Sequence, residues 1–139
     1  MQRDARLRGL SSDHHQALVL ARRLSRAEEG VSPASAEAVR ARFERELEPH
    51  FRVEEDVLLP ALEAAGAHEL AERTLADHVA IRQAVLALGG DDAERAKALG
   101  ARLADHVRFE ERELFPACER LIPAAALEEV LRRAPAPRA

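Results

Sequence analysis

The sequence contains no tryptophan or tyrosine, only four phenylalanines and a single cysteine, Cys118. One cysteine excludes an internal disulfide, and we expect Cys118 to be a small buried core residue. No run of 18 apolar residues is present and the first residues lack a signal-peptide stretch, so we expect a cytoplasmic protein with no membrane partner. A net charge of -4 provides no basic excess of the kind that favours nucleic acid.

The chain is rich instead in alanine, leucine, glutamate and arginine, which are strong helix formers. Its 139 residues suffice for one core, so we expect a single domain over residues 1–139 with a core at about 10–121. The helical repeat of apolar residues predicts an all-α fold. We expect an up-down-up-down antiparallel four-helix bundle with a short C-terminal helix after Pro123. The long helices are expected at about 11–28, 35–65, 67–88 and 92–121.

Local signals refine these helix boundaries. Ser11 or Ser12 is suited to cap the first helix, because serine side chains accept hydrogen bonds from free N–H groups at a helix start. Pro49 and Pro116 fall inside the second and fourth helices, and each is expected to kink or end its helix.

A six-residue pattern occurs twice, 56 residues apart, and a proline stands ten residues after each of its histidines, at Pro60 and Pro116. On a helix, residues i and i+4 share a face, so each copy directs an imidazole and a carboxylate toward one point. This combination of nitrogen and oxygen ligands suits iron, zinc or manganese. The two copies are His50-Phe51-Arg52-Val53-Glu54-Glu55 and His106-Val107-Arg108-Phe109-Glu110-Glu111.

Two further histidines, His14 and His78, each follow an aspartate and lie in an apolar helical stripe. The rise along each helix brings all four histidines and two glutamates to about the same level of the bundle. Carboxylates on a core face are costly unless they are paired or bind metal. We therefore predict a metal site made of His14, His50, Glu54, His78, His106 and Glu110.

Other polar residues near this level are expected to have lesser roles. His15 lies about 100° from the stripe that contains its neighbour, and His68 lies near a helix start, so both are expected at the surface. Glu55 and Glu111 are expected mainly on solvated faces, paired with Arg52 or Arg108.

The six predicted ligands resemble those of the hemerythrin-like proteins, or HHE cation-binding domains, over roughly residues 10–120. That family places a lone histidine, His-x-x-x-Glu, a second lone histidine and another His-x-x-x-Glu on four antiparallel helices. The resemblance implies a non-haem centre of two iron ions, with Glu54 and Glu110 bridging them and the four histidines as terminal ligands. It implies a protein that binds or senses O2, NO or peroxide, or holds iron. Zinc or manganese could substitute.

The resemblance has a gap at Thr74. Oxygen-carrying hemerythrins have two histidines spaced i and i+4 on the third helix, and here Thr74 stands four residues before His78. One iron is therefore expected to have fewer imidazoles, with Glu55, Glu111, Asp77 or His15 available to complete its ligands. This gap disfavours plain O2 carriage.

Alternatives remain open from the sequence. A ferritin-like di-iron oxidase or peroxidase is one, although those bundles typically use Glu-x-x-His. A metal-gated interaction module is another, and a bundle without metal would pair its core histidines and glutamates in salt bridges. A catalytic Ser-His-Asp site has no support, because no nucleophile elbow or glycine-rich phosphate loop is present. Whether the protein is an enzyme stays open, and a dedicated enzyme is the less expected case. Monomer and homodimer are equally compatible with the sequence.

Overall fold

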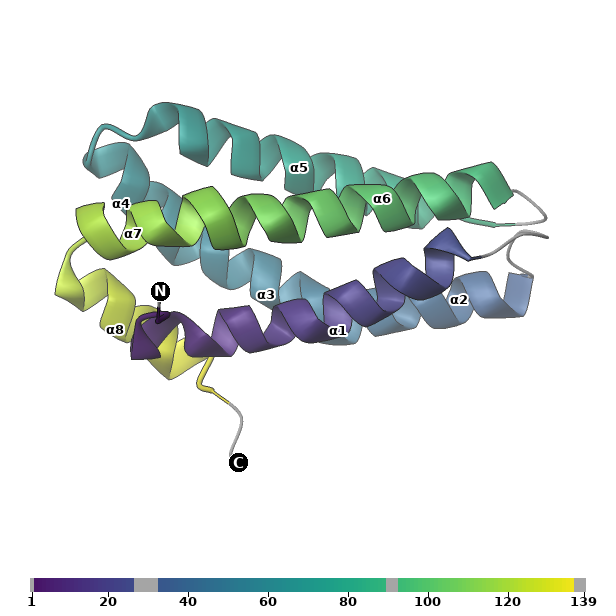
Figure 1. Ribbon diagram of the computed structural model, residues 1–139, viewed down its shortest axis with the longest axis horizontal. Helices are drawn as coiled ribbons and strands as arrows, with labels where there is room; N and C mark the ends of the chain where they lie inside the picture. The colour runs from purple at the N-terminus through teal and green to yellow at the C-terminus, as the bar shows by residue number, and fades with distance from the viewer. Residues whose placement is uncertain (1, 27–32, 90–92, 137–139) are drawn as a thin grey trace.

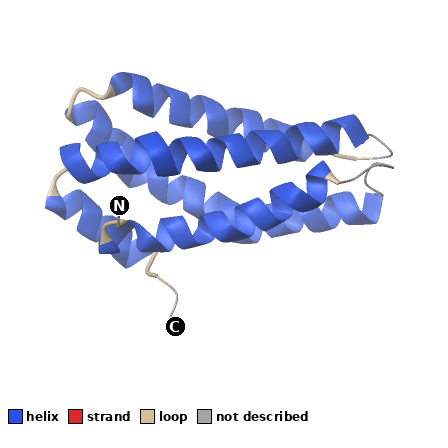
Figure 2. Cartoon of the chain, in the orientation of Figure 1, coloured by secondary structure: helices blue, strands red, loops and turns tan. Residues whose placement is uncertain are grey.

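The computed structural model describes residues 2–26, 33–89 and 93–136, and within these ranges the protein is helical with no strand. Helix accounts for 89% of it, so the predicted all-α class is confirmed. The described residues form five helical stretches, four long and one short. Figure 1 shows how they are arranged. Figure 2 shows the short loops that lead into α5 (His68–Ala87) and α8 (Ala124–Arg133). None of the helices in the described ranges is both long and apolar enough to cross a membrane.

The first stretch begins earlier than predicted. It comprises a 3-10 turn, η1 (Ala5–Leu7), and α1 (Arg8–Ser25). The side chain of Asp4 caps it by accepting a hydrogen bond from the backbone N–H of Arg6, so the expected cap at Ser11 or Ser12 is wrong. The predicted end near Glu28 lies outside the described residues.

The second and fourth stretches are long helices that each change their hydrogen-bond pattern along their length. The second comprises α2 (Pro33–Arg42), η2 (Phe43–Leu47), α3 (Glu48–Val53), η3 (Glu54–Leu58) and α4 (Leu59–Ala64). The third is α5 (His68–Ala87), and the fourth comprises α6 (Ala93–Phe109), η4 (Glu110–Leu114) and α7 (Phe115–Leu121). The short stretch is α8 (Ala124–Arg133).

The segments η2, η3 and η4 are single π-helical turns, and a proline stands two residues after each of them. In each π turn an N–H bonds the carbonyl five residues back, as Leu59 does to Glu54 and Phe115 does to Glu110. A proline has no N–H and its ring crowds the carbonyl of an ordinary helical turn, and the wider turn accommodates it. Pro49 and Pro116 therefore do not end their helices.

The four long stretches lie along the long axis of the molecule, and each runs opposite to the one before it in the chain (Figure 1). α1 packs on α6, and α5 contacts both α4 and α6. Two apolar clusters fill the interior. One includes Leu24, Phe43 and Leu99, and the other includes Leu10, Leu62 and Phe115.

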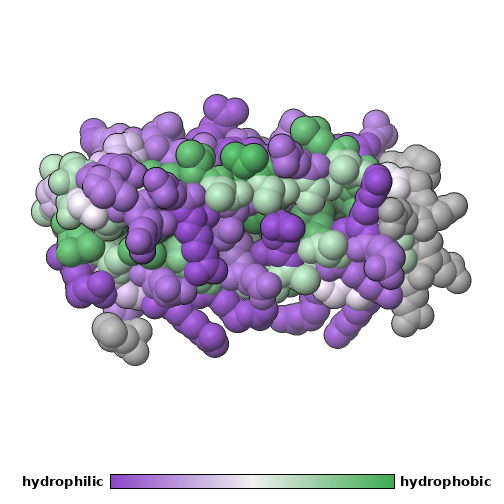
Figure 3. Space-filling view, turned by 90° about the horizontal axis from the view of Figure 1, so that it is seen from above, coloured by the Kyte–Doolittle hydropathy of each residue, from purple (hydrophilic) through white to green (hydrophobic). Residues whose placement is uncertain are grey.

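The outer face of the third stretch carries apolar side chains among polar ones. Figure 3 shows this mixture on one side of the molecule. On α5 the large exposed apolar residues are Leu75, Val79 and Leu86.

Candidate metal centre

Six buried polar residues meet in the interior, at least one from each long helical stretch. His14 lies on α1, His50 on α3, His78 on α5 and His106 on α6. The two glutamates, Glu54 and Glu110, are the first residues of the π turns η3 and η4, and both are fully buried. The sequence thus placed all six residues on core-facing positions, and the structure brings them together.

The six residues form two groups that share both glutamates. One group is His14, His50, Glu54 and Glu110, and the other is Glu54, His78, His106 and Glu110. Within each group the possible ligand atoms lie within 4.8 Å of one another. The contacts are His14 Nε2 to Glu110 Oε1 at 2.8 Å, His50 Nε2 to Glu54 Oε2 at 3.1 Å, His78 Nε2 to Glu54 Oε1 at 3.0 Å and His106 Nε2 to Glu110 Oε2 at 3.0 Å.

Each of the four histidines also contacts a carboxylate with its other ring nitrogen, Nδ1. Such a carboxylate fixes the orientation of the ring and leaves Nε2 directed into the centre. The four pairs are His14 with Glu111 at 2.7 Å, His50 with Asp13 at 3.1 Å, His78 with Glu55 at 2.6 Å and His106 with Asp77 at 3.0 Å.

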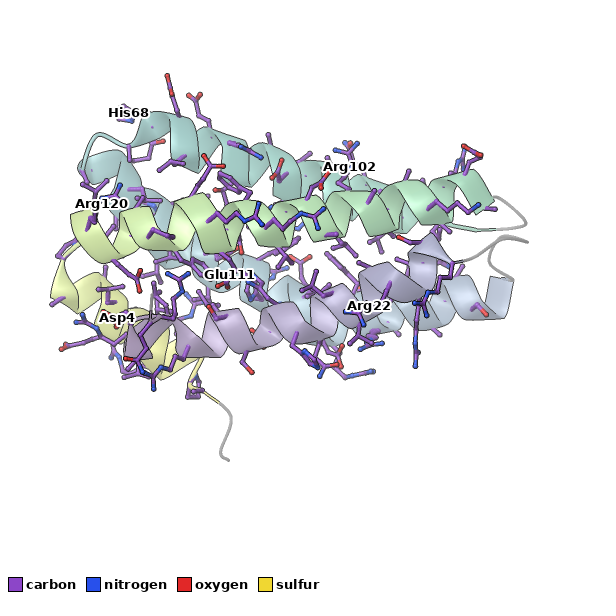
Figure 4. The ribbon with its side chains drawn as sticks, viewed as in Figure 1. Asp4, Arg22, His68, Arg102, Glu111 and Arg120 are labelled. Atoms are coloured by element: carbon purple, nitrogen blue, oxygen red, sulfur yellow. The ribbon has the colours of Figure 1, made fainter. Side chains whose placement is uncertain are left out.

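These four outer carboxylates link the helical stretches in a closed ring. In every pair the carboxylate comes from one stretch and the histidine from the next, and the fourth stretch returns to the first through Glu111 and His14. Figure 4 shows Glu111 between α1 and the α6–α7 stretch. The predicted placement of Glu55 and Glu111 on solvated faces beside Arg52 and Arg108 is therefore wrong.

The charges of these carboxylates change the protonation of the rings in the metal-free protein. Burial by itself favours the neutral imidazole, but the carboxylates that flank each ring outweigh it. They raise the pKa of His78 to about 10 and that of His106 to about 9, and they also raise the pKa of His14 and of His50. Burial opposes ionisation of Glu110, but the charge of His106 and the hydrogen bonds from His106, His14 and His50 together outweigh it and hold the pKa of that carboxyl well below its ordinary value.

Several inward-facing atoms have no hydrogen-bond partner among the described residues. They are Nε2 of His78 and of His106, both carboxylate oxygens of Glu54, and Oε2 of Glu110. Buried polar atoms are nearly always hydrogen-bonded, so these unpaired atoms are exceptions that need an explanation. They lie close together without hydrogen-bond geometry, which indicates that they face a shared space. Imidazole nitrogen and carboxylate oxygen converging in this way fit a transition-metal ion.

Comparison with known families agrees with this geometry. The sequence model of the family called hemerythrin HHE cation binding domain matches residues 4–118. The chain belongs to the hemerythrin HHE family. No curated protein and no solved structure matches it. Membership of this family points to cation binding, and the buried histidine and glutamate groups could hold the metal.

Within this HHE domain the imidazoles are divided evenly. Each group contains two histidines, and Thr74 adds no further imidazole to the group of His78 and His106. Thr74 is fully buried, and its hydroxyl donates a hydrogen bond to the carbonyl of Leu70 on its own helix. His15 is exposed, as predicted, while Asp77 contacts the outer nitrogen of His106. None of these residues belongs to either group.

His68 is remote from the centre, as expected. Its ring is 62% exposed and pairs with Glu63 near the loop between α4 and α5 (Figure 4).

Sequence reasoning missed the roles of the outer carboxylates. Asp13 and Asp77 directly precede two of the inward histidines, and Glu55 and Glu111 directly follow the inward glutamates. These acidic neighbours of the inward residues could have indicated the outer pairs. Adjacent residues on a helix point about 100° apart, so the neighbour of an inward residue can contact the next helix. The pairing across stretches depends on how the helices pack, which the sequence does not state directly.

Proposed function

We propose that this protein holds two iron ions as a hemerythrin-type non-haem centre, in an up-down-up-down four-helix bundle with α8 as a short addition. The observation that carries the proposal is that two ligand groups share Glu54 and Glu110. A carboxylate common to two groups is suited to bridge two ions, and each ion then takes two imidazoles. His14 and His50 would serve one position, and His78 and His106 the other.

Metal sites that react with small molecules keep one coordination position open. Four ligand residues per position would leave room for such an external ligand. An iron pair held here would supply binding and redox chemistry toward O2, NO or peroxide. The chain itself orients the ligands through its outer carboxylates and surrounds them with packed side chains, including Phe51 and Phe115. A surface groove of about 810 Å³ is lined in part by Asp13 and His50 and leads to the outer side of the centre.

The proposed ligands are O2 and NO, and the proposed role is sensing, reaction or iron holding instead of plain O2 carriage. Thr74 supports this role, because it occupies the position of the additional histidine of oxygen carriers. The Thr74 hydroxyl already donates a hydrogen bond to the carbonyl of Leu70, so it does not supply a ligand in place of that imidazole.

A ferritin-like oxidase has less support. Centres of that kind rely on extra glutamates together with Glu-x-x-His. In the described part of this chain only Glu54 and Glu110 belong to the ligand groups, while Glu55 and Glu111 contact the outer nitrogens of histidines.

Metal analysis of protein produced with abundant iron tests the proposal. We expect close to two irons per chain, with antiferromagnetic coupling between them. One iron or fewer after reconstitution, without coupling, would contradict a paired site. Zinc and manganese loading under the same conditions measures how far the ligand set accepts other ions.

A further inference from the structure

Arg82 lies behind one of the metal-site histidines. Its guanidinium contacts Glu55 with Nη1 at 2.7 Å, and Glu55 in turn contacts His78 Nδ1 at 2.6 Å. The same guanidinium forks onto Glu48, with Nη2 at 2.6 Å. It also lies 5.4 Å from the ring centre of Phe51, whose ring stacks on His78 at 3.8 Å. Arg82 therefore reaches His78 by two routes, through a carboxylate and through a phenyl ring.

Arg3 has the same relation to a histidine of the other group. Its Nη2 contacts Glu111 at 3.2 Å, and Glu111 contacts His14 Nδ1 at 2.7 Å. Its Nη1 contacts a second carboxylate, Glu119, at 2.8 Å. It lies 5.4 Å from the ring centre of Phe115, which stacks on His14 at 5.3 Å.

The repeat in the sequence does not account for this similarity. Arg82 follows its histidine by one helical turn on α5, whereas Arg3 comes from the segment that precedes η1. Their second partners, Glu48 and Glu119, also occupy unrelated places relative to the two His-x-x-x-Glu motifs. The same arrangement is thus built from residues at unrelated positions in the sequence. This favours the explanation that the centre requires the arginine over the explanation that it was copied with a sequence repeat.

Ordinary surface ion pairs do not have these features. Arg42 pairs with Glu46 at 2.7 Å and is 19% exposed, the same as Arg3, yet it contacts none of the metal-site histidines or their carboxylates. Asp13 and Asp77, the other outer carboxylates, form no ion pair with arginine in the described part of the chain. Each metal position thus has one histidine backed by arginine and one that is not.

We propose that Arg82 and Arg3 are positioning residues of the metal centre, each fixing the carboxylate that orients one histidine of one metal position. The planar guanidinium can hold two carboxylates at once in fixed directions, which a lysine cannot do. Arg82 acts on the position of His78 and His106, and Arg3 on that of His14 and His50. This inference rests on the proposed two-metal centre.

Titration with cobalt(II), a spectroscopic probe that takes nitrogen and oxygen ligands, tests the proposal in the full-length metal-free protein. In Arg82→Gln we expect one cobalt to bind as in the wild type and the second to bind about 10- to 100-fold more weakly, the range typical for loss of an outer-shell partner. Arg3→Gln is expected to weaken the other position, and the double variant both. The visible absorption of the bound cobalt should change in each case.

Arg42→Gln is the matched control, because it also removes a partly buried arginine ion pair. Its melting temperature without metal should fall about as much as that of Arg82→Gln, while its cobalt affinity stays at the wild-type value. Arg82→Lys restores the charge but not the fork, so it should recover stability without recovering affinity.

Equal cobalt affinities in Arg82→Gln, Arg3→Gln and Arg42→Gln would overturn the positioning role, and so would full recovery by Arg82→Lys. Should Arg82→Gln fail to fold, Arg3→Gln near the chain end provides the same comparison. A wild-type protein that binds fewer than two cobalt ions would instead contradict the proposed function itself, and the inference with it.

Discussion

Glu110, like Glu54, belongs to both ligand groups, so both proposed metal positions depend on it. Its carboxylate lies 2.8 Å from His14 Nε2, 3.3 Å from His50 Nε2 and 3.0 Å from His106 Nε2. Glu110→Gln keeps the size of the side chain but removes its charge. Because Glu110 belongs to both ligand groups, we expect the variant to lose both metals, whereas His50→Ala, which affects one group, should keep one.

The magnitude follows from what remains around position 110. Without metal, the change removes a fully buried carboxylate from buried, protonated imidazoles. Removing one partner of a buried ion pair costs about 3–5 kcal/mol. A domain of this size loses roughly 3–4 °C of melting temperature per kcal/mol, so the midpoint should fall by about 10–20 °C. Metal-loaded samples should differ further, because the variant forgoes about 2.7 kcal/mol per site at a hundredfold excess of metal over Kd.

Metal content after iron reconstitution and thermal unfolding by circular dichroism measure both effects. Glu63→Gln is the control, because Glu63 pairs with the exposed His68 and is itself 47% exposed. It should retain two irons and its melting temperature. Retention of two irons by Glu110→Gln would refute the reasoning. Loss of both irons in His50→Ala, with one kept in Glu110→Gln, would show that the ligands are shared differently.

Three further predictions concern protons and reactivity. Metal binding at pH 7 should release close to two protons from the position of His78 and His106, because their pKa is about 10 and about 9 without metal, and calorimetry in buffers of different ionisation enthalpy measures the release. The same raised pKa values stabilise the metal-free fold fully below about pH 6.5, the ordinary value for histidine, and this contribution is lost as the pH rises through about 9 and about 10. A melting temperature that rises between pH 7 and 10 would contradict it. The reduced iron protein should oxidise rapidly in air, and Thr74→His, which places an imidazole one turn before His78, should slow this oxidation, with Thr74→Val as the control. Reversible O2 binding that lasts for hours in the unmodified protein would argue for a carrier.

The six inward residues could be predicted because helical geometry leaves little freedom. His50 and Glu54 lie four residues apart and must share a face, and the same holds for His106 and Glu110. His14 and His78 lie in apolar stripes, so their burial follows from the stripe.

The helix start and the wide turns could not be predicted in the same way. Ser11 and Ser12 are good caps in isolation, but Leu7 and Leu10 are buried and extend the helix before them, which makes Asp4 the cap. The π turns are a change of hydrogen-bond register in the backbone. The sequence indicates them only indirectly, through the prolines that follow.

Contacts between distant segments escaped prediction for a different reason. Arg3 and Glu111 are 108 residues apart, and only the packing of the N-terminal segment against the fourth stretch brings them together. No periodicity within either segment encodes that contact. The division of imidazoles between the two groups is likewise decided by helix packing, which the position of Thr74 alone could not settle.

The ring of outer carboxylates has a kinetic consequence. Each stretch supports a histidine on the next, and the last stretch supports a histidine on the first. The series of carboxylate–histidine contacts is therefore closed and has no terminal contact that can open by itself. Displacing one stretch breaks two links at once, the one it provides and the one it receives. Release of a bound ion therefore requires the same opening that exposes the interior backbone amides to water. Metal exchange and amide hydrogen exchange at this level of the protein should proceed on one timescale.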